Sequence, residues 1–188
     1  METRSRLRSL ISSRGFWGVL GLAALAGALV LGLQRLGGPA ALHERFGWPA
    51  TLALVGVQSI VAFWPVPVGE MIAFANTLVH GFWIGTALAW SGWMLTAVLQ
   101  YAVARYVVTD LDFAAAIERL PARVRRFPVD HPAFLILGRF VPGPGPQLVN
   151  CAAGAFRVPL WRHTWCAAIG VLPGAMLIAG AATGLELL

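Results

Sequence analysis

FWPVPVGEMIAFAN, residues 63 to 76, places two prolines, a glycine and a carboxylate inside one of the most apolar regions of the chain. Glu70 is the only Asp, Glu, Lys or Arg between Phe46 and Ala104. A charge in such surroundings must stay hydrated, find a partner or take up a proton. The segment therefore predicts a polar feature inside an apolar layer.

The composition as a whole predicts an integral membrane protein. Of the 188 residues, 58% are hydrophobic and 12% are charged, and the mean hydropathy is +0.72. A soluble domain of this size could not bury so much apolar surface. The net charge of +6 comes from 14 arginines and no lysine. Such a basic excess is typical of helix orientation and of contact with anionic lipid headgroups, and it argues against nucleic-acid binding.

The N-terminal unit, residues 1–48, predicts a cytoplasmic basic end, a first transmembrane helix and an outer loop. Four arginines precede an uncharged apolar run from Phe16 to Leu33, which is the pattern of a retained anchor with its N-terminus in the cytoplasm. A cleavable signal peptide with a cleavage site at Ala24-Leu25-Ala26 is the competing interpretation. Residues 35–48 are predicted to be the outer loop.

The next apolar stretch is too short on each side of its break to cross a bilayer. Residues 49–64 and 68–80 give 16 and 13 residues, whereas a spanning helix needs about 20. Hydrocarbon tolerates the backbone groups freed by Pro65, Pro67 and Gly69 only where protein or water covers them. We therefore expect a re-entrant hairpin over 49–80, with its tip at PVPVGE.

A full span is predicted over 82–108. The segment that follows, 109–131, contains Arg119, Arg123, Arg125 and Arg126, so the positive-inside rule places it in the cytoplasm. Within it, residues 113–120 fit either a short interfacial amphipathic helix or a solvated loop.

The second half repeats this pattern. Short apolar runs flank PGPGP, residues 142–146, and predict a second re-entrant segment over 132–157, followed by a span over 159–183. A shift of 77 residues pairs Pro65 with Pro142 and Glu70 with Gln147. The first hairpin enters from outside and the second from the cytoplasm, so the two units are predicted to be inverted repeats. The fold class is therefore an all-α polytopic membrane protein, with residues 49–188 as its repeated domain.

Three runs give this chain a resemblance to a known family: PVPVGE (65–70), RFVPGPGPQLVNCAAGAF (139–156) and GVLPGAM (170–176). It resembles the DedA, or SNARE-associated Golgi protein, superfamily with its VTT domain, over about Val57 to Gly184. The resemblance implies inverted re-entrant hairpins and the movement of phospholipids or polyprenyl phosphates across membranes. By the same resemblance Glu70, Arg139, Asn150 and Gly154 match functional positions. Acidic and arginine residues expected near Gln58 and Gly145 are absent, so proton coupling by an acidic pair is not predicted.

The two tips are the predicted site for substrate binding or gating. Proline and glycine free backbone groups there, and helix N-termini turn their positive ends toward a bound anion. Arg139 could form bidentate hydrogen bonds with a phosphate. Glu70 either pairs with Arg139, carries a proton, or forms with it a buried ion pair that only locks the hairpins together. The predicted site comprises Pro67, Gly69, Glu70, Arg139, Pro142, Gly143, Gln147, Asn150 and Gly154.

The sequence favours a lipid translocator or scramblase over an enzyme. It contains no H-x-x-x-D pair, no G-x-S-x-G and no acidic cluster, so we expect no catalytic residue, metal or cofactor. A non-transporting membrane organiser that binds partners is the alternative. The tryptophans and His163 suit membrane interfaces. The lack of lysine indicates a GC-rich bacterial genome, hence a multi-pass protein of the bacterial inner (plasma) membrane whose partners are lipids; homo-oligomerisation stays open.

Overall fold

The computed structural model describes residues 34–63, 68–106, 122–141 and 144–185, with Glu118 and isolated positions between 21 and 32. In these ranges all regular structure is helical and no strand occurs, which confirms the all-α prediction there. Most of the predicted first span and the 113–120 segment lie outside the described residues. The elements are α3 (Gly38–Phe46), α4 (Trp48–Val61), α5 (Val68–Tyr106), α7 (Ala122–Arg125), α8 (Pro132–Leu137), the 3-10 helix η1 (Gly138–Phe140), α9 (Gly145–Ala155) and α10 (Leu160–Leu185).

Helix α3 lies within residues 35–48, the segment predicted to be an outer loop, and the side of the membrane on which this segment lies stays a prediction. Pro39 fits the first turn of the helix, where a missing N–H leaves no hydrogen bond unmade. The helix ends at Gly47, which has φ 65° and donates its N–H to the carbonyl of His43 at 2.7 Å. A glycine at this position avoids the strain of a Cβ at positive φ. Two short helices therefore meet at a tight corner.

Helix α5 is two helices joined at Gly81. Gly81 has φ 76° and ψ 177°, outside the helical region, and only glycine adopts this conformation without strain. The first arm, 68–80, is about 20 Å long at 1.5 Å per residue, whereas the second arm, 82–106, reaches about 37 Å. Only the second arm is long enough for a hydrocarbon core of about 30 Å.

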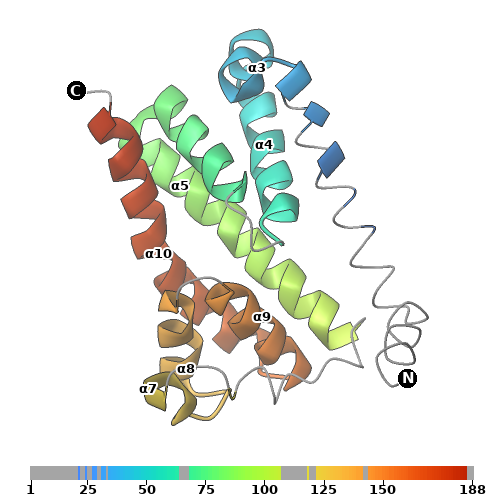
Figure 1. Ribbon diagram of the computed structural model, residues 1–188, viewed down its shortest axis with the longest axis vertical. Helices are drawn as coiled ribbons and strands as arrows, with labels where there is room; N and C mark the ends of the chain where they lie inside the picture. Colours follow the sequence, from blue (N-terminus) through green and yellow to red (C-terminus); the bar gives the residue numbers. More distant parts are fainter. Residues whose placement is uncertain are drawn as a thin grey trace, which may run out of the picture.

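Helix α4 and the first arm of α5 form an antiparallel pair (Figure 1). At one end the rings of Trp48 and His80 stack at 4.8 Å, and Thr51 Oγ1 lies 3.1 Å from His80 Nε2. At the other end a Cβ on Gly69 would lie 2.9 Å from the Cβ of Ala62. The missing side chain therefore lets the two arms meet closely next to the break.

The second hairpin, made of α8, η1 and α9, begins at the opposite end of the molecule from the first (Figure 1). Helices α8, η1 and α9 lie at the end away from α3 (Figure 1), and α9 folds back on η1 so closely that a Cβ on Gly145 would lie 2.7 Å from the carbonyl of Gly138. The 77-residue shift aligns Val68, the first residue of α5, with Gly145, the first residue of α9. It also aligns the break at Gly81 with Val158, in the corner before α10. The internal repeat therefore matches the structure at these two boundaries, whereas α4 and α8 differ in length, with 14 and 6 residues.

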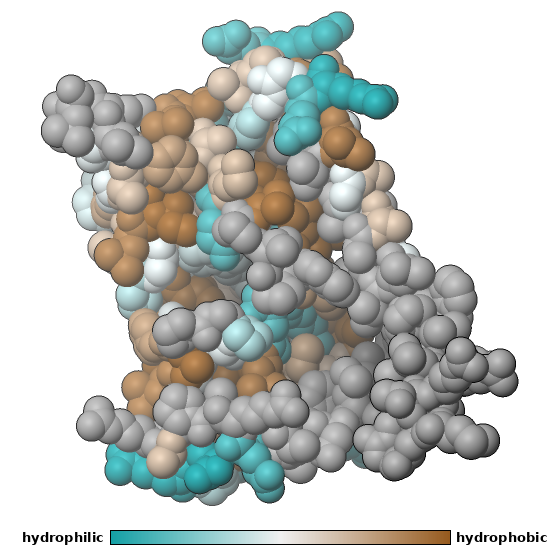
Figure 2. All heavy atoms as spheres, in the orientation of Figure 1, coloured by the Kyte–Doolittle hydropathy of each residue, from teal (hydrophilic) through white to brown (hydrophobic). Residues whose placement is uncertain are grey.

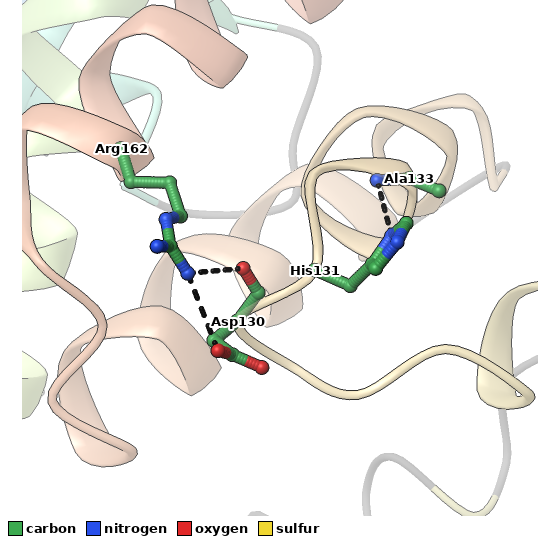
Figure 3. A network of polar contacts seen from close by, with 4 residues as sticks. All are labelled: Asp130, His131, Ala133 and Arg162. Carbon is green, nitrogen blue, oxygen red and sulfur yellow. Dashed lines mark hydrogen bonds and ion pairs between the residues drawn. The ribbon is translucent and has the colours of Figure 1, made fainter.

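Figure 3 shows how the corner that begins this second unit is held. The ring of His131 accepts a hydrogen bond from the N–H of Ala133 at 3.1 Å and caps α8. Arg162 of α10 reaches both the carboxylate and the carbonyl of Asp130 at 3.3 Å. This ion pair is partly exposed, so it contributes little stability. Its effect is to keep the start of α8 beside the start of α10.

The second arm of α5 and helix α10 run antiparallel and pack through small residues. Trp90 Nε1 donates to the carbonyl of Ala168 at 2.9 Å, while Phe82 lies near Gly180 at the far end of the pair. Ala89 of α5 and Ala175 of α10 belong to one fully buried cluster, against which Trp90, Trp93 and Ile178 pack. Such small side chains let two helices approach closely.

Among the residues that the structure describes, two helices are apolar and long enough to cross a membrane by length and composition, Val68–Tyr106 and Leu160–Gly184. Figure 2 shows hydrophilic atoms gathered over α3 at one end and over α7 and α8 at the other, with hydrophobic atoms predominant between them. This banding is what a bilayer requires of a protein that crosses it.

Gly154 lies where α9 crosses the second arm of α5, so Gly154→Val should unfold the protein at a lower temperature. A Cβ there would collide with the carbonyl of Tyr101 and lie 3.1 Å from the Cβ of Ala104. Overpacking of this kind costs about 1–3 kcal/mol. The measurement is thermal unfolding in detergent. Gly56→Ala is the control, since no atom lies within 4 Å of its added Cβ, and an unchanged Tm for Gly154→Val would contradict this packing.

Candidate functional site

A cavity of about 240 Å³ lies between the two helical hairpins, the second arm of α5 and α10. Both halves of the chain contribute to its wall, so it exists only when the two repeats are packed together. Its lining consists of Ala62, Glu70, Trp93, Thr96, Gln100, Arg139, Phe140, Pro146, Gln147, Asn150, Gly170, Val171, Pro173, Gly174 and Leu177.

Four of the predicted site residues meet in this cavity. Glu70, Arg139, Gln147 and Asn150 line it, although up to 80 residues separate them in the sequence. Glu70 and Gln147, the pair predicted by the 77-residue shift, are each the third residue of their helix.

The predicted glycines have a different place. Gly69 and Gly154 do not line the cavity. Each lies at a helix contact, where the missing side chain lets two segments approach closely. Pro67, Pro142 and Gly143 lie outside the described residues.

Arg139 is the buried cation of the site. Its side chain is 6% exposed, and its Nε donates to the carbonyl of Leu135, one helical turn earlier, at 2.9 Å. Its two terminal nitrogens, Nη1 and Nη2, are buried and have no hydrogen-bond partner among the described residues. Unpaired buried donors are unfavourable, and on a charged group the cost is highest. The guanidinium is therefore arranged for an acceptor that the described chain does not supply.

Glu70 does not pair with Arg139. The carboxylate belongs to the first turn of α5 and is exposed, and among the described residues no ion pair of 4.0 Å or less joins it to Arg139. The interpretation of a buried ion pair that locks the hairpins is therefore wrong. The physical reason is that Glu70 lies at the exposed edge of the cavity, whereas Arg139 extends through its buried side. In the first turn the carboxylate also complements the positive end of the helix.

Gln100 connects both hairpins to the second arm of α5, and sequence reasoning did not identify it. Its Oε1 accepts a hydrogen bond from Asn150 Nδ2 of α9 at 2.7 Å. Its Nε2 donates to the carbonyl of Phe63, just past α4, at 3.3 Å. One buried amide thus satisfies a backbone group at the first break and holds the return helix of the second hairpin.

Further polar side chains join α4 to the second arm of α5. Thr96 lies one turn before Gln100, and its Oγ1 donates to the carbonyl of Ser59 at 3.1 Å. Gln58 donates to the carbonyl of Ala89 at 3.2 Å but does not line the cavity. The detectable signal was the four-residue spacing of Gly92, Thr96 and Gln100 in an apolar span, which marks one helix face.

Two further predictions about interface residues are corrected. Trp93 lines the cavity, and the Trp90 indole reaches the backbone of α10, so neither belongs to a membrane-interface belt. His163 is fully buried, with its ring stacked on Tyr101 at a centroid distance of 5.1 Å. All three lie between α5 and α10, a contact that local sequence does not reveal.

The cavity wall is polar at its buried side, and its exposed edge is apolar apart from the Glu70 carboxylate. Thr96, Gln100 and Asn150 are buried, whereas Phe140 is 54% and Leu177 is 74% exposed. Because the helical surface around this edge is hydrophobic, the cavity suits a molecule with a polar head and a hydrocarbon part better than a fully polar solute.

The model of the VTT domain family matches residues 64–183 of the chain. The chain belongs to this family. The VTT domain is the domain of the DedA and SNARE-associated Golgi proteins, so the resemblance drawn from the sequence is confirmed. With its two long apolar helices the chain is a membrane protein of that family. No curated protein and no solved structure matches the chain significantly.

The matched residues of this VTT-domain protein include almost the whole cavity wall; Ala62 alone precedes them. The described part of the chain has no group of three or more His, Cys, Asp or Glu placed to hold a metal ion. The chemistry that the wall offers is hydrogen bonding from one guanidinium and several amides. Groups of this kind can bind and orient an anion.

The Gln100–Asn150 hydrogen bond should appear as coupling between the two positions. Gln100→Leu or Asn150→Leu alone leaves the partner's buried amide unsatisfied, whereas the double variant removes both groups. We expect the double variant to be more stable than the sum of the single losses by about 0.5–3 kcal/mol. Reversible unfolding in mixed micelles of increasing SDS fraction measures the four free energies. Strict additivity would contradict a direct link.

Proposed function

We propose that this VTT-domain protein is a lipid translocator or scramblase that moves lipids with anionic, phosphate-bearing headgroups between bilayer leaflets. The single observation that carries the proposal is Arg139, a buried guanidinium in a cavity wall whose terminal nitrogens have no acceptor among the described residues. A phosphate presents several oxygens that match the planar fork of a guanidinium.

The start of α9 supports the same choice of ligand. Pro146 and Gln147, in its first turn, line the cavity. Pro146 has no N–H, so Gly145 and Gln147 supply the first-turn N–H groups that lack intrahelical acceptors, and the helix dipole adds positive potential there. An anion in the cavity would thus meet a helix N-terminus as well as Arg139.

The exposed apolar edge favours an amphiphilic substrate over a free anion. A headgroup beside Arg139 could keep its hydrocarbon chains outside the cavity along Phe140 and Leu177. Movement of a headgroup across the apolar layer requires a polar route, and a cavity with a buried polar wall provides one. Glu70, at the exposed edge, is assigned to gating and not to headgroup binding.

In the proposed topology the two hairpins are re-entrant and the two long helices span an inner membrane. The arms of the first hairpin are too short to cross, and its open end returns to α3 (Figure 1). Five arginines lie in or next to the end of α5, helix α7 and the start of α10: Arg105, Arg125, Arg126, Arg157 and Arg162. On the other side, Arg45 lies in α3 and Arg35 shortly before it. The positive-inside rule then places the α7 and α8 end in the cytoplasm.

The proposal requires no covalent step, no metal and no partner other than lipid. The alternative is a membrane organiser that binds lipid or protein without moving lipid. Vesicles separate the two, because only a translocator changes the leaflet in which a headgroup is exposed.

Single cysteines test the topology in a background with Cys151 and Cys166 replaced by alanine. Cysteines at Arg45 and Trp83 should react with a membrane-impermeant maleimide from outside, because the hairpin returns to its starting side. A cysteine at Tyr106 should react only from the cytoplasm. Arg45, Trp83 and Tyr106 are all exposed side chains. Labelling of position 83 from the cytoplasm alone would mean that residues 49–80 cross the membrane.

Arg139→Met tests the proposed activity. We expect it to abolish movement of fluorescent phosphatidylglycerol in phosphatidylcholine vesicles, because the headgroup loses its cation. The ligand-free protein should lose no more than about 1 kcal/mol of stability, or should gain some, because the substitution removes a buried and incompletely bonded charge. Dithionite quenching measures lipid movement and thermal unfolding measures stability.

Arg162→Met is the matched control, since this arginine pairs with Asp130 away from the cavity. It should move lipid at the unmodified rate. Full activity of Arg139→Met would overturn the headgroup assignment. An inactive wild-type protein would favour the organiser.

A further inference from the structure

Gly170 of α10 faces the side chain of Arg139. A Cβ added to Gly170 would lie 2.6 Å from Cδ, 3.4 Å from Nε and 3.7 Å from Cγ of Arg139. The first of these distances is far shorter than an ordinary carbon–carbon contact. Arg139 therefore passes α10 through space that exists only because residue 170 has no side chain.

This space has a definite relation to the cavity. Gly170 and Arg139 both line it, and the Nε of Arg139 is already held by the carbonyl of Leu135. With Nε fixed on one side and α10 on the other, the guanidinium has little freedom to rotate. Its terminal nitrogens then keep a fixed direction, and no described residue accepts a hydrogen bond from them.

We propose that Gly170 is a positioning residue for Arg139: the missing side chain of α10 forms a slot that holds the guanidinium in the geometry needed to bind a phosphate headgroup. This inference rests on the proposed function. Gly170 itself touches no headgroup and acts only through Arg139.

A role in helix packing alone would look different. At Gly154 the added Cβ meets the carbonyl of Tyr101 and the Cβ of Ala104, which belong to a rigid helix. At Gly170 the three nearest atoms all belong to the side chain of Arg139. A side chain can turn away where a backbone cannot, so Gly170→Ala should leave the fold intact and displace the guanidinium.

Helix α10 supplies a matched control. Gly174 lies one turn from Gly170 and also lines the cavity, but a Cβ there would meet the Trp93 ring at 3.5 Å, an ordinary van der Waals distance. Gly174→Ala therefore adds the same methyl group to the same helix without touching Arg139. Each substitution should also raise helix propensity by a similar amount.

The experiment compares Gly170→Ala with Gly174→Ala in the full-length protein by two measurements. The first is the rate at which phenylglyoxal modifies Arg139, followed by mass spectrometry without any lipid. The second is binding of short-chain dihexanoyl phosphatidic acid in detergent. We expect Gly170→Ala to accelerate modification, because a guanidinium turned out of the slot is less buried, and to weaken binding about tenfold or more, the value of one charge-assisted hydrogen bond. Gly174→Ala should leave the modification rate of Arg139 unchanged, and both variants should unfold within a few degrees of the wild type.

A conservative replacement separates positioning from a general loss of folding. The flexible amine of Arg139→Lys is not held at Nε and can move aside, so adding Gly170→Ala to it should weaken binding much less than in the arginine background. An unchanged modification rate of Arg139 in Gly170→Ala would overturn the slot, whatever the lipid result. An accelerated rate together with a wild-type protein that binds no phosphatidic acid would keep the slot and overturn the proposed function.

Discussion

Buried polar groups in this fold depend on protein partners, because hydrocarbon offers none. Gln100 is such a partner for both halves of the chain. It donates a hydrogen bond to the carbonyl of Phe63 at the end of the first hairpin arm, and it accepts one from the amide of Asn150 in the second hairpin. Broken helices beside a membrane interior are tolerated only with such partners. The break at the tip of the first hairpin, the return of α9 and the cavity between them therefore depend on one buried amide of α5.

Arg139, in contrast to Gln100, has buried donors that no described residue satisfies. The chain satisfies its Nε through Leu135 and leaves its terminal nitrogens without described acceptors. A core selected for stability alone would replace such a charge with an apolar side chain. Arg139 instead lies beside glycines of α10 that widen the cavity. A buried charge in such a place is typical of a binding site, where function is obtained at a cost in stability. In the proposed mechanism the headgroup supplies the missing acceptors.

The two repeats share helix boundaries at the starts of α5 and α9 but have different polar residues. The 77-residue shift places Glu70 and Gln147 at the third position of corresponding helices, and both reach the cavity. One repeat thus brings a carboxylate to the exposed edge of the cavity, and the other brings a neutral amide and the buried Arg139. An asymmetric cavity between corresponding hairpins can orient a ligand that has two unlike ends.

The sequence by itself determined the helical class and the interruptions between α4 and α5 and between η1 and α9, because proline, glycine and run length act through local backbone geometry. The inverted orientation of the two repeats stays a prediction. The sequence also pointed to Glu70, Arg139, Gln147 and Asn150, which line the cavity, since polar residues are rare in apolar runs. Local pattern did not reveal α3, a glycine-bounded helix within the predicted outer loop. Only the tertiary structure decided that Glu70 and Arg139 stay apart, that Gln100 joins the hairpins and that Gly170 makes room for Arg139. Each of these depends on distances between helices far apart in the chain, and those distances are set by side-chain packing across the whole fold.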